Sequence, residues 1–486
     1  MIFVTVFIDL LGFGIVLPLL PRYAQHFHAD GLTLGLLMAS FSAMQFLFAP
    51  LWGRVSDKVG RRPVLMLGLA GSTLFYALFG VATTLGAAGQ WLGLGVIPWL
   101  FLCRIGAGIA GATIPTAQAY IADVTTAANR AKGMALIGAA FGVGFTFGPL
   151  LGALFVSGDV GDATTLAHPA VVEQLKITPD QSKQIAAVVQ KYDAKLEEKR
   201  LTLKRKDRQQ LLDARERDVL KLFTPAQTEA WLKFSAPSPW PGYAASVLSG
   251  LALLFSIFLL PESLQPGAAR ASGGHWLEWR GVQQALTQPA LLLVLVTMFL
   301  TTCAFAQFES TLSLLTAQLG LADRYNYFVF AYIGFVLSLS QGFLVRRLVP
   351  RLGEFVMSIA GTLLMTAGLL LIGLAGVQDS VAMLYAVVPI CVIGVSAVNP
   401  SLQSLLSRQT SESQQGEVLG VGQSVSALAR IAGPVIGLTL SDISIIWPYW
   451  SAAGLMGLGV LMTLLLPRTT GHITAGGAVP APAAPD

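Results

Sequence analysis

Four charged residues lie inside long apolar segments of this chain: Asp9, Arg104, Glu309 and Arg430. A charge within an apolar span is energetically costly, so such residues are usually functional. A carboxylate held away from water can take up and release a proton near neutral pH. An arginine keeps its proton in a protein, so it can only help a nearby carboxylate to release one. Together these residue types predict a proton-exchanging site.

Each of the four residues also has another interpretation. Asp9 follows only eight residues and could be a helix-end carboxylate at the membrane surface. Arg104 could bind backbone carbonyls. Glu309 is either a second protonation site or the anchor for a cationic substrate. Arg430 is either a counter-charge or a contact that holds the cytoplasmic gate.

Other kinds of chemistry have no support in the sequence. It contains no nucleotide-binding loop, no Cys/His cluster of metal-ligand spacing and no nucleophile triad. The three cysteines, Cys103, Cys303 and Cys391, all lie in apolar runs. We therefore expect no enzyme activity, no cofactor and no resident metal, with an ion gradient as the energy source. The net charge of +5 is explained by helix ends and gives no reason to expect nucleic-acid binding.

The composition identifies the elements that must position these residues. The chain is 54% apolar and 12% charged, about half the charged fraction of a soluble protein. Spans of roughly 20 apolar residues can cross a bilayer. We predict an all-α membrane protein with twelve such spans, at 2–21, 31–52, 63–85, 93–122, 133–156, 243–261, 289–316, 325–345, 354–376, 380–406, 417–440 and 446–466.

The distribution of lysine and arginine predicts the orientation. Thirteen of them lie in the loops on one side, including the tail, and the opposite short loops hold only Arg22 and Arg324. Cytoplasmic loops are enriched in these residues, so both termini are predicted to be cytoplasmic. The segment 157–242 then falls outside, where its length exempts it from that rule.

The ten residues from Gly53 to Arg62 form a basic segment between two spans. Their glycines, charges and spacing resemble the G-x-x-x-D-[KR]-x-G-R-[KR] motif between transmembrane helices 2 and 3 of the major facilitator superfamily. The resemblance implies a cytoplasmic gate in which Asp57 and Arg61 form a latch and Asp57 pairs with Arg130 of the next cytoplasmic loop. The residues that carry the motif are Gly53, Asp57, Lys58, Gly60, Arg61 and Arg62.

The two halves of the chain repeat. Pro115, Gln118, Thr125 and the pair Gly148-Pro149 recur 285 residues later. The basic segment recurs 289 residues later, with Arg346 in place of Asp57. Such parallel repeats place a substrate site between two bundles near the middle of the membrane. The predicted domains are a first six-helix bundle (1–156 with 243–261), an insertion (157–242), a cytoplasmic linker (262–288), a second bundle (289–468) and a disordered tail (469–486).

Three further motifs resemble the drug:H+ antiporter branch of the same superfamily, which includes the tetracycline exporters. Asp9 begins a D-x-x-G-x-G-x-x-x-P pattern in the first span, and Arg104 begins an R-x-x-x-G pattern in the fourth. The antiporter motif of the fifth span is matched by Gly138, Gly142, Gly144, Gly148, Pro149 and Gly152. Ala153 departs from that motif, and the third span lacks the acidic residue of the tetracycline exporters, which argues against a tetracycline–metal substrate.

The insertion 157–242 is the anomaly. It is highly charged, and two T-P-x-Q segments, at 178–181 and 224–227, are each typical of a capped helix start. We expect helix over about 178–222, broken near 204–210, and a short helix from 224. The paired segments resemble the LTxxQ motif of small periplasmic stress-chaperone proteins, which implies a periplasmic protein partner. A charged spacer with no partner is the alternative.

We therefore predict a monomeric transporter in the bacterial inner membrane that exports a small amphipathic compound in exchange for protons by alternating access. Two alternatives stay open. One is proton-coupled uptake of a metabolite. The other is an envelope sensor or assembly factor that acts through 157–242.

Overall fold

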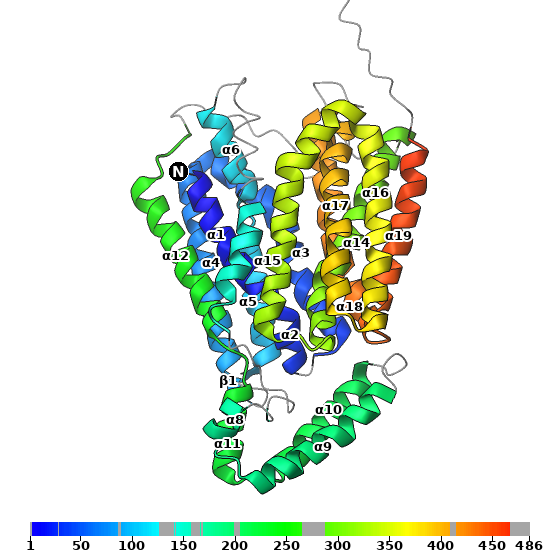
Figure 1. Cartoon of the computed structure of the whole chain (residues 1–486). Helices are drawn as coiled ribbons and strands as arrows, with labels where there is room; N and C mark the ends of the chain where they lie inside the picture. The colour runs from blue at the N-terminus through cyan, green and yellow to red at the C-terminus, as the bar shows by residue number, and fades with distance from the viewer. Residues whose placement is uncertain are drawn as a thin grey trace, which may run out of the picture.

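The chain folds into two helical bundles that lie side by side, with a separate group of short helices at one end (Figure 1). The computed structural model describes residues 2–27, 29–85, 89–125, 140, 142–156, 166, 169–198, 205–264, 287–408 and 415–466. Strand within these residues is confined to one small hairpin, in which β1 (Gln90–Trp91) pairs antiparallel with β2 (Leu94–Gly95).

The first bundle contains the helices that come before and after the predicted insertion. They are α1 (Ile2–Val16), α2 (Leu20–His26), α3 (Gly31–Val59), α4 (Arg61–Thr84), α5 (Val96–Ala110), α6 (Ile114–Val124), the helix Gly142–Gly152, and α12 (Trp240–Leu259). Two predicted spans are each broken into two helices. The first breaks around Pro18 and the fourth around Gly111, because proline and glycine both weaken a continuous helix.

The second bundle contains α14 (Pro289–Gln318), α15 (Asp323–Leu339), the π-helix η2 (Ser340–Val345), α16 (Arg346–Gln378), α17 (Val381–Arg408), α18 (Gln415–Ser441) and α19 (Trp447–Leu464). Among the described residues, nine helices are long and apolar enough to cross a membrane. One of them, Asp323–Gln378, covers two predicted spans. The all-α membrane fold is thus confirmed, whereas the count of twelve spans stays a prediction.

The remaining helices, which we call the α8–α11 unit, are α8 (Pro169–Gln174), α9 (Pro179–Glu198), α10 (Arg205–Leu220) and α11 (Pro225–Ser235). The region expected as one interrupted helix is therefore two helices, α9 and α10, that pack together as a hairpin. Tyr192 of α9 donates a hydrogen bond to Asp218 of α10 at 2.7 Å, and Arg215 pairs with Asp193 at 2.7 Å. The unit has its own apolar core around Trp231.

The two ends of the molecule differ. At the end that we call the hinge end, Ile2 at the start of α1 packs with Leu65, Ile121 and Leu260, and α19 ends there too (Figure 1). The α8–α11 unit lies at the opposite end, which we call the α8–α11 end. There the apolar core of the first bundle continues into the second, through contacts with Leu314, Tyr327 and Leu438.

Candidate functional site

Asp9 lies in the second turn of α1 and points into the first bundle. Its carboxylate accepts a hydrogen bond of 2.9 Å from the hydroxyl of Ser249, a fully buried residue of α12. Ser72 of α4 also hydrogen-bonds to it. The hydroxyls stabilise a charge that is partly removed from water, since Asp9 is half-buried. Asp9 is therefore held against two other helices of the first bundle, and its role in proton exchange stays a prediction.

Arg104 of α5 is also in the interior, with 4% of its surface exposed. Its guanidinium carbon lies 4.4 Å from the centre of the Phe41 ring of α3, a cation–π contact. Its Nε atom makes no hydrogen bond to any described residue. Arg104 is therefore held against an aromatic ring with one N–H group left without a described acceptor, and its part in proton release stays a prediction.

Glu309 of α14 is the carboxylate that the sequence singles out inside a span of the second bundle. It interacts electrostatically with Arg430 of α18, and also with Arg104 across the boundary between the bundles. This neighbourhood suits the interpretation of Arg430 as a counter-charge, which stays a prediction. Two bundles thus each supply one carboxylate and one arginine, and the four predicted residues carry no net charge when both carboxylates are ionised.

Tyr76 of α4 connects the two carboxylate environments and was missed at the sequence level. It is buried near both Asp9 and Arg104, whose charges act on its hydroxyl in opposite directions. The groups form a series of electrostatic neighbours, from Asp9 through Tyr76 and Arg104 to Glu309 and Arg430. A tyrosine in an apolar helix carries no pattern that distinguishes it from a packing residue, so Tyr76 could not be identified from the sequence.

The antiporter-motif glycines lie where helices approach most closely. A Cβ atom on Gly148 would come within 2.9 Å of both Gly14 Cα and Leu11 O in α1, and one on Gly144 within 2.9 Å of Leu10. One on Gly152 would overlap the Tyr327 ring of α15, at 2.4 Å, in the other bundle. Small residues permit such close helix packing in membranes. Gly142 similarly faces Ser338 of α15, whereas Gly138 lies outside the described residues.

The basic segment 53–62 is more helical than expected. Helix α3 continues to Val59, and the turn is a single residue, Gly60, whose φ of 108° favours glycine. Gly53 lies inside α3, and a Cβ there would meet no atom within 4 Å. Across this turn Arg61 donates a hydrogen bond of 2.7 Å back to the Ser56 hydroxyl of α3.

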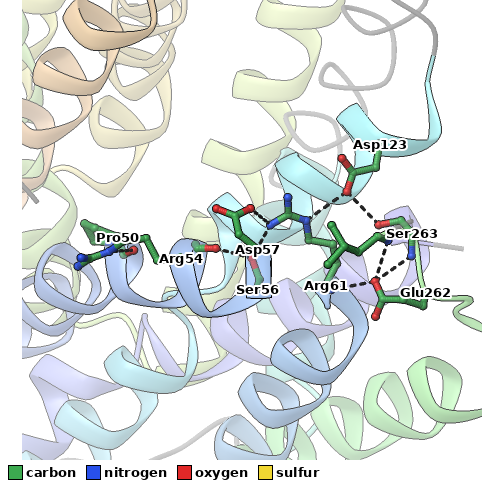
Figure 2. A network of polar contacts seen from close by, with 10 residues as sticks. Pro50, Arg54, Ser56, Asp57, Arg61, Asp123, Glu262 and Ser263 are labelled. Atoms are coloured by element: carbon green, nitrogen blue, oxygen red, sulfur yellow. Dashed lines mark hydrogen bonds and ion pairs between the residues drawn. The ribbon is translucent and has the colours of Figure 1, made fainter. Parts of the chain in front are cut away.

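Arg61 is the centre of the predicted latch (Figure 2). It is 5% exposed and forms ion pairs with Asp57, at 2.5 Å, and with Asp123 at the end of α6, at 3.1 Å. Ser263 also donates a hydrogen bond to Asp123. The sequence places Asp57 and Arg61 in one latch but expects Asp57 to pair with Arg130, and it does not single out Asp123. Lys58 is exposed, and Arg130, the expected partner of Asp57, lies outside the described residues.

Glu262, which follows α12, caps the start of α4. Its carboxylate accepts hydrogen bonds from the backbone N–H groups of Arg61, at 2.9 Å, and Arg62, at 3.1 Å. Partial burial raises the pKa of Glu262, but the backbone hydrogen bonds outweigh it and hold the pKa below the ordinary 4.5. A depressed pKa means that the cap contributes fully at neutral pH and is lost as the pH falls through the lowered value. The cap links helices α4 and α12 at the hinge end.

The second bundle carries a counterpart of this latch with its charges reversed. A positive-φ glycine, Gly353, interrupts α16 as Gly60 separates α3 from α4. The next residue, Glu354, pairs with Arg408 at the end of α17, at 2.6 Å. Arg408 lies 285 residues after Asp123, the repeat spacing. The turn at Gly353 lies 293 residues after Gly60, four more than the 289-residue spacing of the basic segments.

Comparison with known proteins identifies the family of the chain. The family model "Major Facilitator Superfamily" matches residues 2–161, 230–434 and 359–485. The class C tetracycline resistance protein of Escherichia coli is 28% identical over 89% of this chain and 86% of its own. Multidrug resistance protein 2 of Bacillus subtilis is 23% identical over 95% of this chain and 93% of its own. These two relatives support the drug:H+ antiporter branch.

Solved transporter structures share the fold. The crystal structure of the human organic anion transporter MFSD10 (TETRAN) has a TM-score of 0.56 and 24% identity, covering 95% of this chain and 97% of that one. The D-xylose-proton symporter has a TM-score of 0.61 and 16% identity, with 96% of each chain covered. Since the family model and the fold both extend over most of the sequence, this chain is a secondary transporter that belongs to the Major Facilitator Superfamily.

Proposed function

We propose that the protein exports a small amphipathic compound from the bacterial cytoplasm in exchange for protons. The observation that carries this proposal is the series of ionisable groups from Asp9 to Arg430, with one carboxylate in each bundle. The names of the tetracycline- and multidrug-resistance relatives support export. In this orientation the hinge end is cytoplasmic and the α8–α11 unit is periplasmic.

The charge balance of the site suggests how exchange is enforced. With both carboxylates ionised, Asp9 and Glu309 neutralise Arg104 and Arg430. A proton on Glu309 leaves one excess positive charge, which disfavours a cationic group at the same place. A substrate that places a positive group beside Glu309 therefore competes with the proton. Competition of this kind is the condition for antiport, because the two ligands occupy the site in turn.

Proteoliposomes test this proposal directly. We expect a fluorescent lipophilic cation such as ethidium to accumulate in the vesicles against its gradient when a pH difference is imposed across the membrane. An ionophore that collapses the pH difference should reduce accumulation to passive equilibration. Accumulation that is equally strong with and without the pH difference would exclude proton exchange, and a lack of transport for a panel of amphipathic anions, cations and neutral compounds would exclude export of this class.

The latch around Arg61 is proposed to hold helices α3, α4 and α6 as one body during the transport cycle. Asp57→Asn removes one of the two carboxylates of Arg61. We expect transport to fall about tenfold while expression stays near normal, since a charge-assisted hydrogen bond contributes about 1.5–3 kcal/mol. Lys58→Gln, an exposed position in the same motif, is the matched control. Initial transport rates normalised to protein amount provide the measurement, and an undiminished rate for Asp57→Asn rules out the latch.

A further inference from the structure

Arg22, a residue that the sequence suggested only as a loop charge, ties the two bundles together at the α8–α11 end. Its guanidinium pairs with Asp323 of α15 at 2.7 Å and donates hydrogen bonds to Thr316 Oγ1, at 2.9 Å, and to Ser313 O, at 3.1 Å. The two side chains of the ion pair are 10% and 9% exposed. One residue of α2 therefore holds both α14 and α15.

A second group of contacts depends on the break in the first span. Because α1 ends before Pro18, carbonyl groups near the break lack partners within the helix. Residues of the second bundle supply them. Asn326 donates to Pro18 O at 3.0 Å, and Tyr327 donates to Ile15 O at 2.7 Å. The Ser313 hydroxyl also donates to Pro18 O. Separating the bundles here would leave buried polar groups without partners, which is energetically costly.

A third contact lies between α3 and α18. The backbone N–H of Gly31, at the start of α3, donates to Asp442 Oδ2 at 2.8 Å. A Cβ atom on Gly35, one turn further along α3, would lie 2.8 Å from the Cα atom of Val435 in α18. The bundles are therefore closed against each other at this end through two helix pairs, each of which combines polar contacts with close packing.

The α8–α11 unit reaches the same corner of the second bundle. It is rooted in the first bundle, where Tyr23 donates to Ser238 O at 2.6 Å and Ser238 donates to Phe155 O at 3.0 Å. From there the α9–α10 hairpin extends beneath the second bundle (Figure 1). Arg208 of α10 donates a hydrogen bond of 2.8 Å to Gln318, the last residue of α14. Gln318 lies five residues before Asp323 in the sequence.

The hairpin is braced internally, so it can act as a rigid arm. Gln181 and Gln227, the two N3 residues of the paired T-P-x-Q starts, hydrogen-bond to each other at 3.1 and 3.2 Å. Gln181 also donates to Leu222 O, and Gln227 to Leu175 O. These bonds fix the start of α9 to the start of α11. The two T-P-x-Q motifs thus hold the base of the hairpin, and α10 of the same hairpin contacts α14.

We propose that Arg22 and Asp323 form a gate at the α8–α11 end, and that the α8–α11 unit is a strap that holds this gate closed through Arg208. Opening the transporter toward that end then requires breaking the buried ion pair and lifting the strap from Gln318. The strap thereby biases the resting protein toward the state in which only the hinge end can open. This inference rests on the alternating access of the proposed function, but not on the identity of the substrate or on proton coupling.

Electron paramagnetic resonance distances in lipid nanodiscs test the proposal without substrate or gradient. Spin labels are placed at Leu92→Cys, in the β1–β2 turn of the first bundle, and Gln378→Cys, at the end of α16; both positions are exposed. The native cysteines are at most 2% exposed and should not be labelled. The readout is the ratio of the long-distance to the short-distance population, which reports opening at the α8–α11 end.

Arg22→Met and Asp323→Asn should each raise this ratio about tenfold or more, because each breaks a buried charge-assisted contact. Arg208→Ala should raise it about threefold, since its contact is only partly buried. Arg324→Met, an exposed arginine next to Asp323, is the matched control and should leave it within about twofold. Unchanged populations in folded Asp323→Asn protein overturn the gate, and an unchanged ratio for Arg208→Ala overturns the strap. Because the readout involves no transport, a failure of proton exchange would leave it intact.

Discussion

Replacing Glu309 by glutamine should abolish proton-driven accumulation of substrate. Glutamine has nearly the same shape and still fills the space beside Arg430, but it cannot carry or release a proton. Arg104 and Arg430 would then face an uncharged group, as if the site were permanently protonated. We expect uphill transport of ethidium in proteoliposomes to fall to the level of protein-free vesicles, with a loss of proton release when substrate is added to the purified protein.

Two further variants make this result specific. Asp9→Asn should reduce uphill transport as well, because Asp9 begins the same series of groups, but its two hydroxyl partners can also bond an amide, so the protein should remain folded. Glu229→Gln changes an exposed carboxylate of the α8–α11 unit and is the matched control. A Glu309→Gln protein that accumulates substrate as strongly as the control would remove Glu309 from the coupling mechanism.

The residue types of the candidate site could be predicted from the sequence, whereas most contacts between them could not. Charges in apolar spans are rare enough that Asp9, Arg104, Glu309 and Arg430 could be identified individually. In the structure Arg104 is buried, Asp9 and Glu309 are half-buried, and Arg430 is exposed. Tyr76, in contrast, is one of many aromatic residues in apolar helices. The set of partners predicted for Arg61 is also incomplete. Asp123 and Glu262 lie 62 and 201 residues away in the sequence, and their local context is that of ordinary helix-end charges.

The largest omission concerns the contacts between the bundles. Arg22 and Arg324 were both counted as loop charges on the less basic side, and nothing local distinguishes them. The structure separates them completely, because Arg22 is buried in an ion pair with Asp323 whereas Arg324 is exposed. Which of two similar charges becomes buried depends on how the halves dock, roughly 300 residues apart in the sequence, and periodicity reports only on contacts within one helix or span.

Glycines show the same limit of sequence analysis, because their contacts also depend on distant residues. They lead to the second prediction with a large expected effect. Gly53 and Gly148 each match a motif of the family, so the sequence ranked them equally. The structure distinguishes the two glycines. A Cβ atom on Gly148 would lie 2.9 Å from two backbone atoms of α1, whereas one on Gly53 would meet no atom within 4 Å. Backbone atoms cannot rotate away as side chains can. Gly148→Ala must therefore push α1 away from its neighbouring helix, together with Asp9.

We expect Gly148→Ala to lower the unfolding free energy by about 1–3 kcal/mol, the usual range for overpacking, and to reduce transport at least about tenfold. Gly53→Ala should leave transport unchanged and stability equal or slightly higher, since alanine favours a helix over glycine by about 0.8–1 kcal/mol. Thermal unfolding in detergent and transport in proteoliposomes measure the two effects separately.

If Gly53→Ala proves as damaging as Gly148→Ala, then the motif glycine Gly53 serves a conformation other than this one, in which α3 bends at Gly53. Equal tolerance of both changes would instead mean that the contact between α1 and the helix Gly142–Gly152 is loose enough to absorb a methyl group, and that close packing there has no part in coupling.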